Sequence, residues 1–297
     1  MKIKYKIAAF VLISGALILL INNYRPFPKS SKNDARYFWA HKTHGEQTAH
    51  IVFGGDSRIY RGVNPASFGS SALNLGYSAQ GYSNKYMDFV EDHLNEKKPT
   101  IVLGISPYSL TPKACLNEHL ESEQKRSSYD IFQILSIEKH LRFLEPIRPS
   151  EIKNAMQNND KGYHEHFHEN GWVASNRFDA DTNRTLLKYR DNFTDNMVSD
   201  SVIHLLSERV KKWTKAGIQV FAFRPPSSIS MEDLENEISG YDELRMEEVI
   251  FDCGGIWLEI NNNYHSYDGS HLSKRAAMKF SNELNAKIEA IQATQQQ

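Results

Sequence analysis

The sequence predicts an α/β protein: a three-layer α/β/α sandwich around a mostly parallel sheet of about five strands. Short apolar runs rich in β-branched residues alternate with longer segments whose apolar residues recur at helical spacing. Several of the short runs stop at glycine or proline, as buried strands do where they leave a sheet. A third observation, an apolar stretch behind three lysines, predicts a transmembrane helix at the N-terminus.

The length and composition suit one globular domain with appendages. The chain has 297 residues, of which 40% are hydrophobic and 24% charged. Its 35 Lys and Arg nearly balance its 36 Asp and Glu, and no basic run follows the first few residues, so attraction to nucleic acid is not expected. The two cysteines, Cys115 and Cys253, could pair in an exported protein, but unpaired and partly buried thiols are favoured.

Residues 1–24 predict a signal anchor. Lys2, Lys4 and Lys6 precede an uncharged apolar run over residues 7–21, which is the arrangement of an export signal or a membrane anchor. The run is somewhat shorter than the roughly 20 residues of a typical spanning helix. Because no small-x-small cleavage site follows, an uncleaved anchor is favoured over a cleaved signal or a buried core helix. We therefore expect a single-pass protein of the bacterial inner membrane, with its C-terminal domain in the periplasm or another extracytoplasmic space.

Beyond the anchor, the pattern divides the chain into a linker and one domain. Residues 25–48 are polar, contain two prolines and predict a linker. The domain covers 49–297, with strands predicted at 50–53, 72–75, 100–105, 218–223 and 256–260. Helices are predicted at 82–95, 198–216, 231–250 and 273–291. The alternation breaks down over 112–195, which predicts a polar insertion, helical at about 129–144 and otherwise loop.

Polar residues that can carry chemistry follow the predicted strands. Ser57 follows the first strand in Gly-Asp-Ser, and Asp268 and His271 lie in Asp-Gly-Ser-His before the last helix. The carboxyl ends of parallel strands meet at one edge of a sheet, so these side chains are expected to lie together. A serine nucleophile needs a base, and a carboxylate can fix the tautomer of that base. Each motif alone also fits a turn or a helix cap, but together they predict a catalytic triad.

With these motifs the chain resembles the SGNH/GDSL hydrolase superfamily over residues 49–110 and 196–292. The resemblance implies that Ser57 is the nucleophile and that its amide shares an oxyanion hole with the amide of Gly76 in Asn-Leu-Gly. The family usually supplies a third donor from Gly-x-Asn-Asp. Here Gly-Ile-Ser-Pro stands in its place, so Ser106 or a backbone amide would be the third donor.

The N-terminal anchor, Gly-Asp-Ser-Arg, Asn-Leu-Gly and Gly-x-Ser-Pro together resemble one membrane-anchored branch of this superfamily. Its members work beside membrane-bound O-acyltransferases on bacterial surface polysaccharides, as in alginate acetylation or teichoic-acid D-alanylation. This implies transfer of an acetyl or similar group to or from a cell-surface polysaccharide through acyl-Ser57, without a cofactor. An exported carboxylesterase or deacetylase is one alternative. A catalytically silent glycan-binding or scaffolding subunit is the other, because the asparagine is missing.

Two further groups of residues are candidates for ligand binding. Arg58 and Arg224 follow predicted strands and are expected to bind substrate at the rim of the site, with ion pairing inside the fold as the alternative. His164, His166 and His168 alternate in the polar insertion and could in principle bind a metal. They lack a supporting ligand set, so a solvated loop is favoured and no metal site is predicted.

Overall fold

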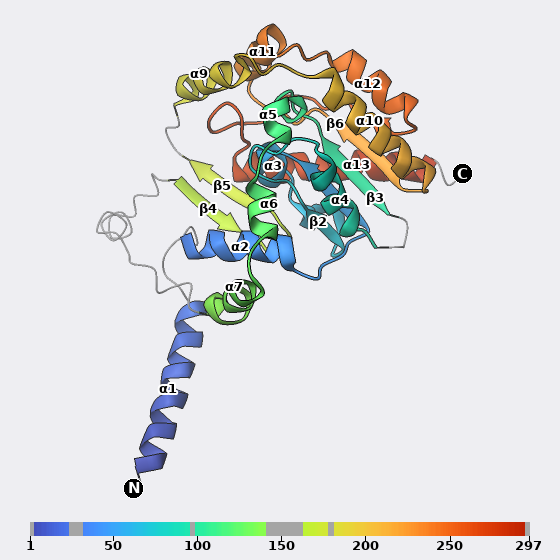
Figure 1. The fold of residues 1–297 in the computed structure, drawn as a ribbon. Helices are drawn as coiled ribbons and strands as arrows, with labels where there is room; N and C mark the ends of the chain where they lie inside the picture. The colour runs from blue at the N-terminus through green and yellow to red at the C-terminus, as the bar shows by residue number, and fades with distance from the viewer. Residues whose placement is uncertain (1–2, 24–31, 96–98, 141–162, 178–180, 295–297) are drawn as a thin grey trace.

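A five-stranded parallel sheet forms the centre of the molecule, which confirms the predicted α/β sandwich (Figure 1). The computed structural model describes residues 3–23, 32–95, 99–140, 163–177 and 181–294. The strand order is β2-β1-β3-β6-β7, and every neighbouring pair is parallel. The strands are β1 (Ile51–Gly55), β2 (Ala72–Asn74), β3 (Thr100–Gly104), β6 (Gln219–Phe223) and β7 (Ile256–Trp257). Four match the predicted runs closely, and β7 is shorter than expected.

Helices cover both faces of the sheet because alternate strand residues point to opposite sides. Val52 and Ile101 pack into a core with helices α4 (Asn84–Asp92), α10 (Asp200–Lys215) and α12 (Glu243–Asp252). Phe53 and Val102 pack into the other core. That second core includes residues of α3 (Ser57–Gly62), the 3₁₀ turn η1 (Pro65–Phe68) and α13 (Lys274–Thr294).

The helix predicted over 231–250 is two helices. The first, α11 (Ile229–Ile238), ends before Gly240, whose φ of +73° lies in the left-handed region that stops a helix. The second helix, α12, begins three residues later and packs on the sheet. The two thiols, Cys115 and Cys253, are free and partly buried, as favoured from the sequence, and burial raises the pKa of Cys115 to about 11.

Part of the predicted linker is a helix of the domain. Helix α2 (Lys32–His44) buries Phe38 and Ala40, and the Trp39 ring lies 5.4 Å from the ring of Tyr60 and 4.9 Å from that of Tyr77. The polar composition of residues 25–48 gave no sign of this packing. The run Tyr37–Ala40, three aromatic residues and an alanine, is enough to dock the helix. The linker prediction is therefore corrected for α2.

The insertion is richer in structure than its polar composition predicted. It contains α5 (Pro112–Cys115), α6 (His119–Gln124), α7 (Ser128–Phe132), the π turn η3 (Gln133–Ile137), the 3₁₀ turn η4 (Glu138–His140) and α9 (Thr182–Phe193). Residues 129–140 are helical as predicted, and 141–144 lie outside the described residues. The predicted loop is wrong where β4 (Tyr163–Phe167) and β5 (Val173–Arg177) form an antiparallel hairpin. Its turn covers the edge strand β2, since the Asn74 N–H donates to the Asn170 carbonyl over 2.9 Å.

The N-terminal helix α1 (Ile3–Asn23) extends from the rest of the molecule (Figure 1). Its mean hydropathy over residues 3–20 is 2.0, and that stretch is not buried by the rest of the protein. At 1.5 Å per residue its 21 residues span about 32 Å, which is long enough for a bilayer core. The helix can thus cross a membrane or act as a signal anchor.

Candidate functional site

The turn from β1 into α3 places Ser57 at the carboxyl edge of the sheet. Gly55 has a φ of +149°, and a Cβ there would lie 2.5 Å from Ile59 Cγ1 and 2.8 Å from the Gly104 carbonyl, so only glycine fits. Asp56 caps the helix by accepting the Arg58 N–H over 2.9 Å. Strand β1 lies between β2 and β3, where the connections leave in opposite directions. Ligand sites of α/β sheets form at such a point.

Ser57, His271 and Asp268 form a continuous chain of hydrogen bonds. Ser57 Oγ lies 2.8 Å from His271 Nε2, and His271 Nδ1 lies 2.8 Å from Asp268 Oδ2. The other carboxylate oxygen, Asp268 Oδ1, accepts the N–H groups of Ser270 and His271 over 3.0 and 2.8 Å. The structure therefore brings together the three residues that the two sequence motifs predicted.

The electrostatics of this chain leave His271 neutral at pH 7. Burial lowers the pKa of His271 below its usual 6.5, although the hydrogen bond with Asp268 opposes that shift. Burial alone would raise the pKa of Asp268, but the hydrogen bonds from His271 and Ser270 outweigh it and lower the value to about 2. With Nδ1–H directed at the carboxylate, Nε2 carries the lone pair and can accept the Ser57 proton.

Two predicted oxyanion donors are engaged elsewhere. The Gly76 N–H donates to Asn74 Oδ1 over 3.0 Å. The Ser106 hydroxyl is fully buried and donates to Asp56 Oδ2 over 2.6 Å, where it steadies the cap of α3. The predictions that Gly76 and Ser106 donate to an oxyanion are therefore corrected, because each donor already has an internal acceptor.

The loop after β2 contributes a residue that sequence reasoning missed. Ala79 has a φ of +52°, which is uncommon for a residue other than glycine, and it lines the same cleft as Ser57. Asn117 Nδ2 fixes the loop by donating to the carbonyls of Ser78 and Ala79 over 2.6 and 2.8 Å. Among the described residues, the amides of Ser57 and Ala79 donate to no protein acceptor. An alanine gives no sequence signal that its backbone N–H faces a cleft and is free to bind an oxyanion.

A cleft of about 1010 Å³ opens over Ser57 and His271. Its walls come from α3, the loop of Ser78 and Ala79, Tyr108, and helix α9 of the insertion. The lining is mostly polar, and its charged residues include Arg61, Asp181, Arg184, Lys188 and Asp191. This volume and chemistry suit a polar substrate larger than a simple acetyl ester.

Arg58 and Arg224 were expected at the rim, but they form buried ion pairs. Arg58 Nη2 lies 2.5 Å from Glu235 Oε1, with the two side chains 1% and 0% exposed. Arg224 Nη2 contacts the other Glu235 oxygen over 3.3 Å, and its Nη1 lies 3.2 Å from Glu243. Neither arginine lines the cleft. Their prediction as substrate-binding residues is corrected, and the alternative of ion pairing inside the fold is confirmed.

The buried Arg58 also supports the loop that carries Asp268 and His271. Arg58 Nε donates to Ser270 Oγ over 3.2 Å, and the Tyr189 hydroxyl lies 2.7 Å from the same oxygen. The Arg58 guanidinium stacks over the Tyr189 ring at 5.4 Å. Since Tyr189 belongs to α9, one network connects the nucleophile turn, the loop and the cleft wall.

Lys42 of α2 is enclosed by four aromatic rings. Its Nζ donates to the carbonyls of Gly76 and Gly171 over 2.6 and 3.1 Å. Burial lowers its pKa well below the usual value, whereas the carbonyls and the ring faces favour the charged form. The caging rings, 5.1–5.5 Å from Nζ, are those of Phe38, Trp39, Tyr60 and Tyr77.

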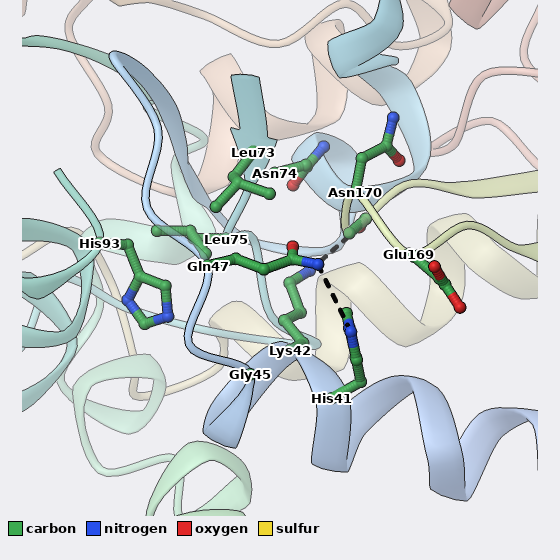
Figure 2. A pocket seen from close by; sticks show the side chains of 11 residues that line it. His41, Lys42, Gly45, Gln47, Leu73, Asn74, Leu75, His93, Glu169 and Asn170 are labelled. Atoms are coloured by element: carbon green, nitrogen blue, oxygen red, sulfur yellow. Dashed lines mark hydrogen bonds between the residues drawn. The ribbon is translucent and has the colours of Figure 1, made fainter. Parts of the chain in front are cut away.

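The cavity beside Lys42 is too small for a substrate. Figure 2 shows Lys42 beneath β2, with Gln47 and His41 joined by a hydrogen bond beside it. The cavity measures about 10 Å³, which is room for about one water molecule. It does not include Ser57 or His271.

The three alternating histidines of the insertion lie in and after β4. The rings of His166 and His168 are 4.5 Å apart, and His168 stacks on Trp172 at 4.7 Å. The side chain of His164 lies outside the described residues. Within the described parts of the chain, no three metal-binding side chains come together. The prediction of a solvated loop is therefore wrong: the histidines lie in and directly after strand β4, and His168 packs on Trp172.

No model of a known family matches the sequence, and no curated protein matches it. One solved structure from Streptococcus pneumonia is described as a provisionally assigned platelet activating factor. It aligns with 94% of this chain and 99% of its own length, at 11% sequence identity and a TM-score of 0.37. A similarity at this TM-score carries no inference about activity.

Proposed function

We propose that this protein is an SGNH-type serine enzyme that forms a covalent acyl-Ser57 intermediate. The observation that carries the proposal is the hydrogen-bond chain from Asp268 through His271 to Ser57, at the floor of a cleft of about 1010 Å³. A serine, a neutral histidine and an ionised carboxylate in this order provide a nucleophile, its base and the group that orients the base.

The chemistry follows from these positions. His271 Nε2 accepts the Ser57 proton while Oγ attacks the acyl carbonyl, and the imidazolium then protonates the departing alcohol. In the second half, His271 takes a proton from a sugar hydroxyl or water, which attacks the acyl carbon and releases Ser57. We propose that the amides of Ser57 and Ala79, which line the cleft and donate to no acceptor among the described residues, stabilise the oxyanion, each contributing on the order of 3 kcal/mol.

We further propose that the enzyme transfers an acetyl or similar group to or from a bacterial cell-surface polysaccharide. The large polar cleft supports this substrate class, because it exceeds what a simple ester needs. Helix α1 supports a membrane anchor. We propose that the domain lies outside the cytoplasm and works beside a membrane-bound O-acyltransferase, as the resemblance of the sequence motifs implies. A carboxylesterase or deacetylase uses the same triad with water as acceptor. The catalytically silent subunit remains the alternative that a test of Ser57 decides.

Ser57 should react with an active-site phosphonate. The intact protein, incubated with a fluorophosphonate ester, should gain one adduct mapped to Ser57 by mass spectrometry, because His271 activates that hydroxyl. Ser57→Ala should gain none. As a matched control, Ser106→Ala should keep the adduct, since Ser106 faces Asp56 rather than the cleft. A folded wild-type protein without an adduct would rule out the catalytic proposal in favour of the silent subunit.

Partition of the acyl group distinguishes transfer from hydrolysis. With an aryl acetate as donor and a set of oligosaccharides as acceptors, a transferase should yield acetylated sugar that grows with acceptor concentration. An esterase should yield acetate alone at a rate that the sugars leave unchanged. Mass spectrometry of the sugar pool measures the difference.

The pH dependence of Ser57 phosphonylation should report the titration of His271. Only neutral His271 accepts a proton, so the rate should be level around pH 7 and fall on acidification with a midpoint below 6.5, because burial lowers this pKa. Asp268 stays ionised throughout that range, with a pKa of about 2. A midpoint clearly above 6.5 would contradict the burial-dominated shift. Rates at constant ionic strength provide the measurement.

A further inference from the structure

The helical segment of α7, η3 and η4 carries both buried and exposed apolar residues. Its inner side packs on α2: Ile134 is fully buried and, with Leu135, contacts Tyr37 and Ala40. These contacts account for the docking of the segment. They do not account for its exposed apolar residues.

Three large apolar residues of this segment are exposed. Tyr129, Phe132 and Ile137 are 73%, 59% and 47% exposed, although they lie within nine residues of each other. We call them the outer apolar face. Single exposed apolar residues are ordinary, but a group of this kind on one short segment indicates a contact surface.

The outer apolar face belongs to the end of the domain nearest α1. Helix α1 contacts η4, and Figure 1 shows α7 beside the end of α1 that leads into the domain. Arg36, near the start of α2, donates to Glu138 of η4 over 3.1 Å. Only eight residues separate α1 from α2, and a chain of eight residues reaches at most about 29 Å. The membrane surface from which α1 emerges is therefore within reach of this face.

We infer that Tyr129, Phe132 and Ile137 contact the headgroup region of the bilayer that α1 crosses. Tyrosine and other amphipathic aromatic residues are favoured at that depth, and the apolar area that is exposed in water would be covered there. The inference rests on the anchoring part of the proposed function and is independent of catalysis. It gives the domain a fixed orientation, with the α9 wall of the cleft at the opposite end of the molecule from α7 (Figure 1).

Spin-label accessibility in nanodiscs tests this contact. The full chain, carrying Cys115→Ser and Cys253→Ser, is reconstituted in nanodiscs of phosphatidylcholine and phosphatidylglycerol and labelled at Phe132→Cys. Phe251→Cys, on α12 and 75% exposed, is the matched control, and Leu17→Cys in α1 is the reference for lipid. Relaxation by oxygen reports lipid, and relaxation by a water-soluble nickel chelate reports solvent.

We expect the label at position 132 to collide with the nickel chelate several-fold less, and with oxygen more, than the label at 251. Equal nickel accessibility at 132 and 251, with the label at 17 in lipid, overturns the inference while leaving the anchor intact, and points to a protein partner for this face. A water-exposed label at 17 overturns both the anchor and the inference. Phosphonate reaction at Ser57 in the same samples reports the catalytic proposal separately.

Discussion

Asp268→Asn should slow the reaction of Ser57 with a phosphonate or an acetyl ester by on the order of 10⁴-fold, as the equivalent change does in serine proteases. Asparagine can keep Oδ1 as the acceptor for the Ser270 and His271 N–H groups, so the loop should hold its shape. Its Nδ2 would then donate to His271 Nδ1, which forces the ring proton onto Nε2. That tautomer cannot accept the Ser57 proton.

The rate and the fold must be measured together for this variant. Thermal unfolding within a few degrees of the wild type would show that the loop survives, and the loss of rate would then belong to the tautomer. A rate within tenfold of the wild type in a folded variant would mean that Asp268 does not orient the base. Ser57→Ala gives the background rate of the assay.

Glu235→Ala should destabilise the protein by about 3–5 kcal/mol, because it leaves the buried Arg58 cation without its ion-pair partner. Arg58 and Arg224 both pair with Glu235, and the Arg58–Glu235 contact is almost wholly removed from water. Removing the carboxylate leaves the Arg58 guanidinium without its ion-pair partner, whereas Arg224 keeps its contact with Glu243. Urea unfolding of the full chain in detergent, followed by tryptophan fluorescence, gives the change in the free energy of unfolding.

An exposed ion pair provides the control for that measurement. Arg245→Ala removes a contact of 2.7 Å with Asp200 at the surface, where such pairs contribute less than about 1 kcal/mol. If the two variants lose comparable free energy of unfolding, burial is not the reason that Glu235 stabilises the protein.

The sheet could be predicted because its strands are buried on both faces. Runs such as 100–105 lack charged residues and are rich in β-branched ones, and no helix in the described part of the domain shows that composition. The β4–β5 hairpin could not be recognised this way. It buries Trp172 and Ser175 among residues that are polar overall, so its stability depends on tertiary contacts that no local pattern reveals.

The same distinction explains the site. Ser57, Asp268 and His271 could be predicted because their motifs are local and strand ends converge. The roles of Arg58 and Ser106 depend on which groups face them across the fold, namely Glu235, 177 residues away, and Asp56, 50 residues away. Both residues follow a strand, so the sequence correctly places them at the edge of the sheet. It does not show whether their side chains point toward the cleft or into the fold.

The hydrogen bond between Ser57 and His271 joins residues 214 positions apart. In the membrane-anchored enzyme proposed above, the part of the domain next to the anchor crosses the membrane first, so Ser57 crosses early and His271 crosses last. A serine without a base is a weak nucleophile, so the reactive group remains inert until nearly the whole domain has crossed and folded. If Ser57 carries the proposed acyl intermediate, the order of the two motifs along the chain confines that chemistry to the completed, exported molecule.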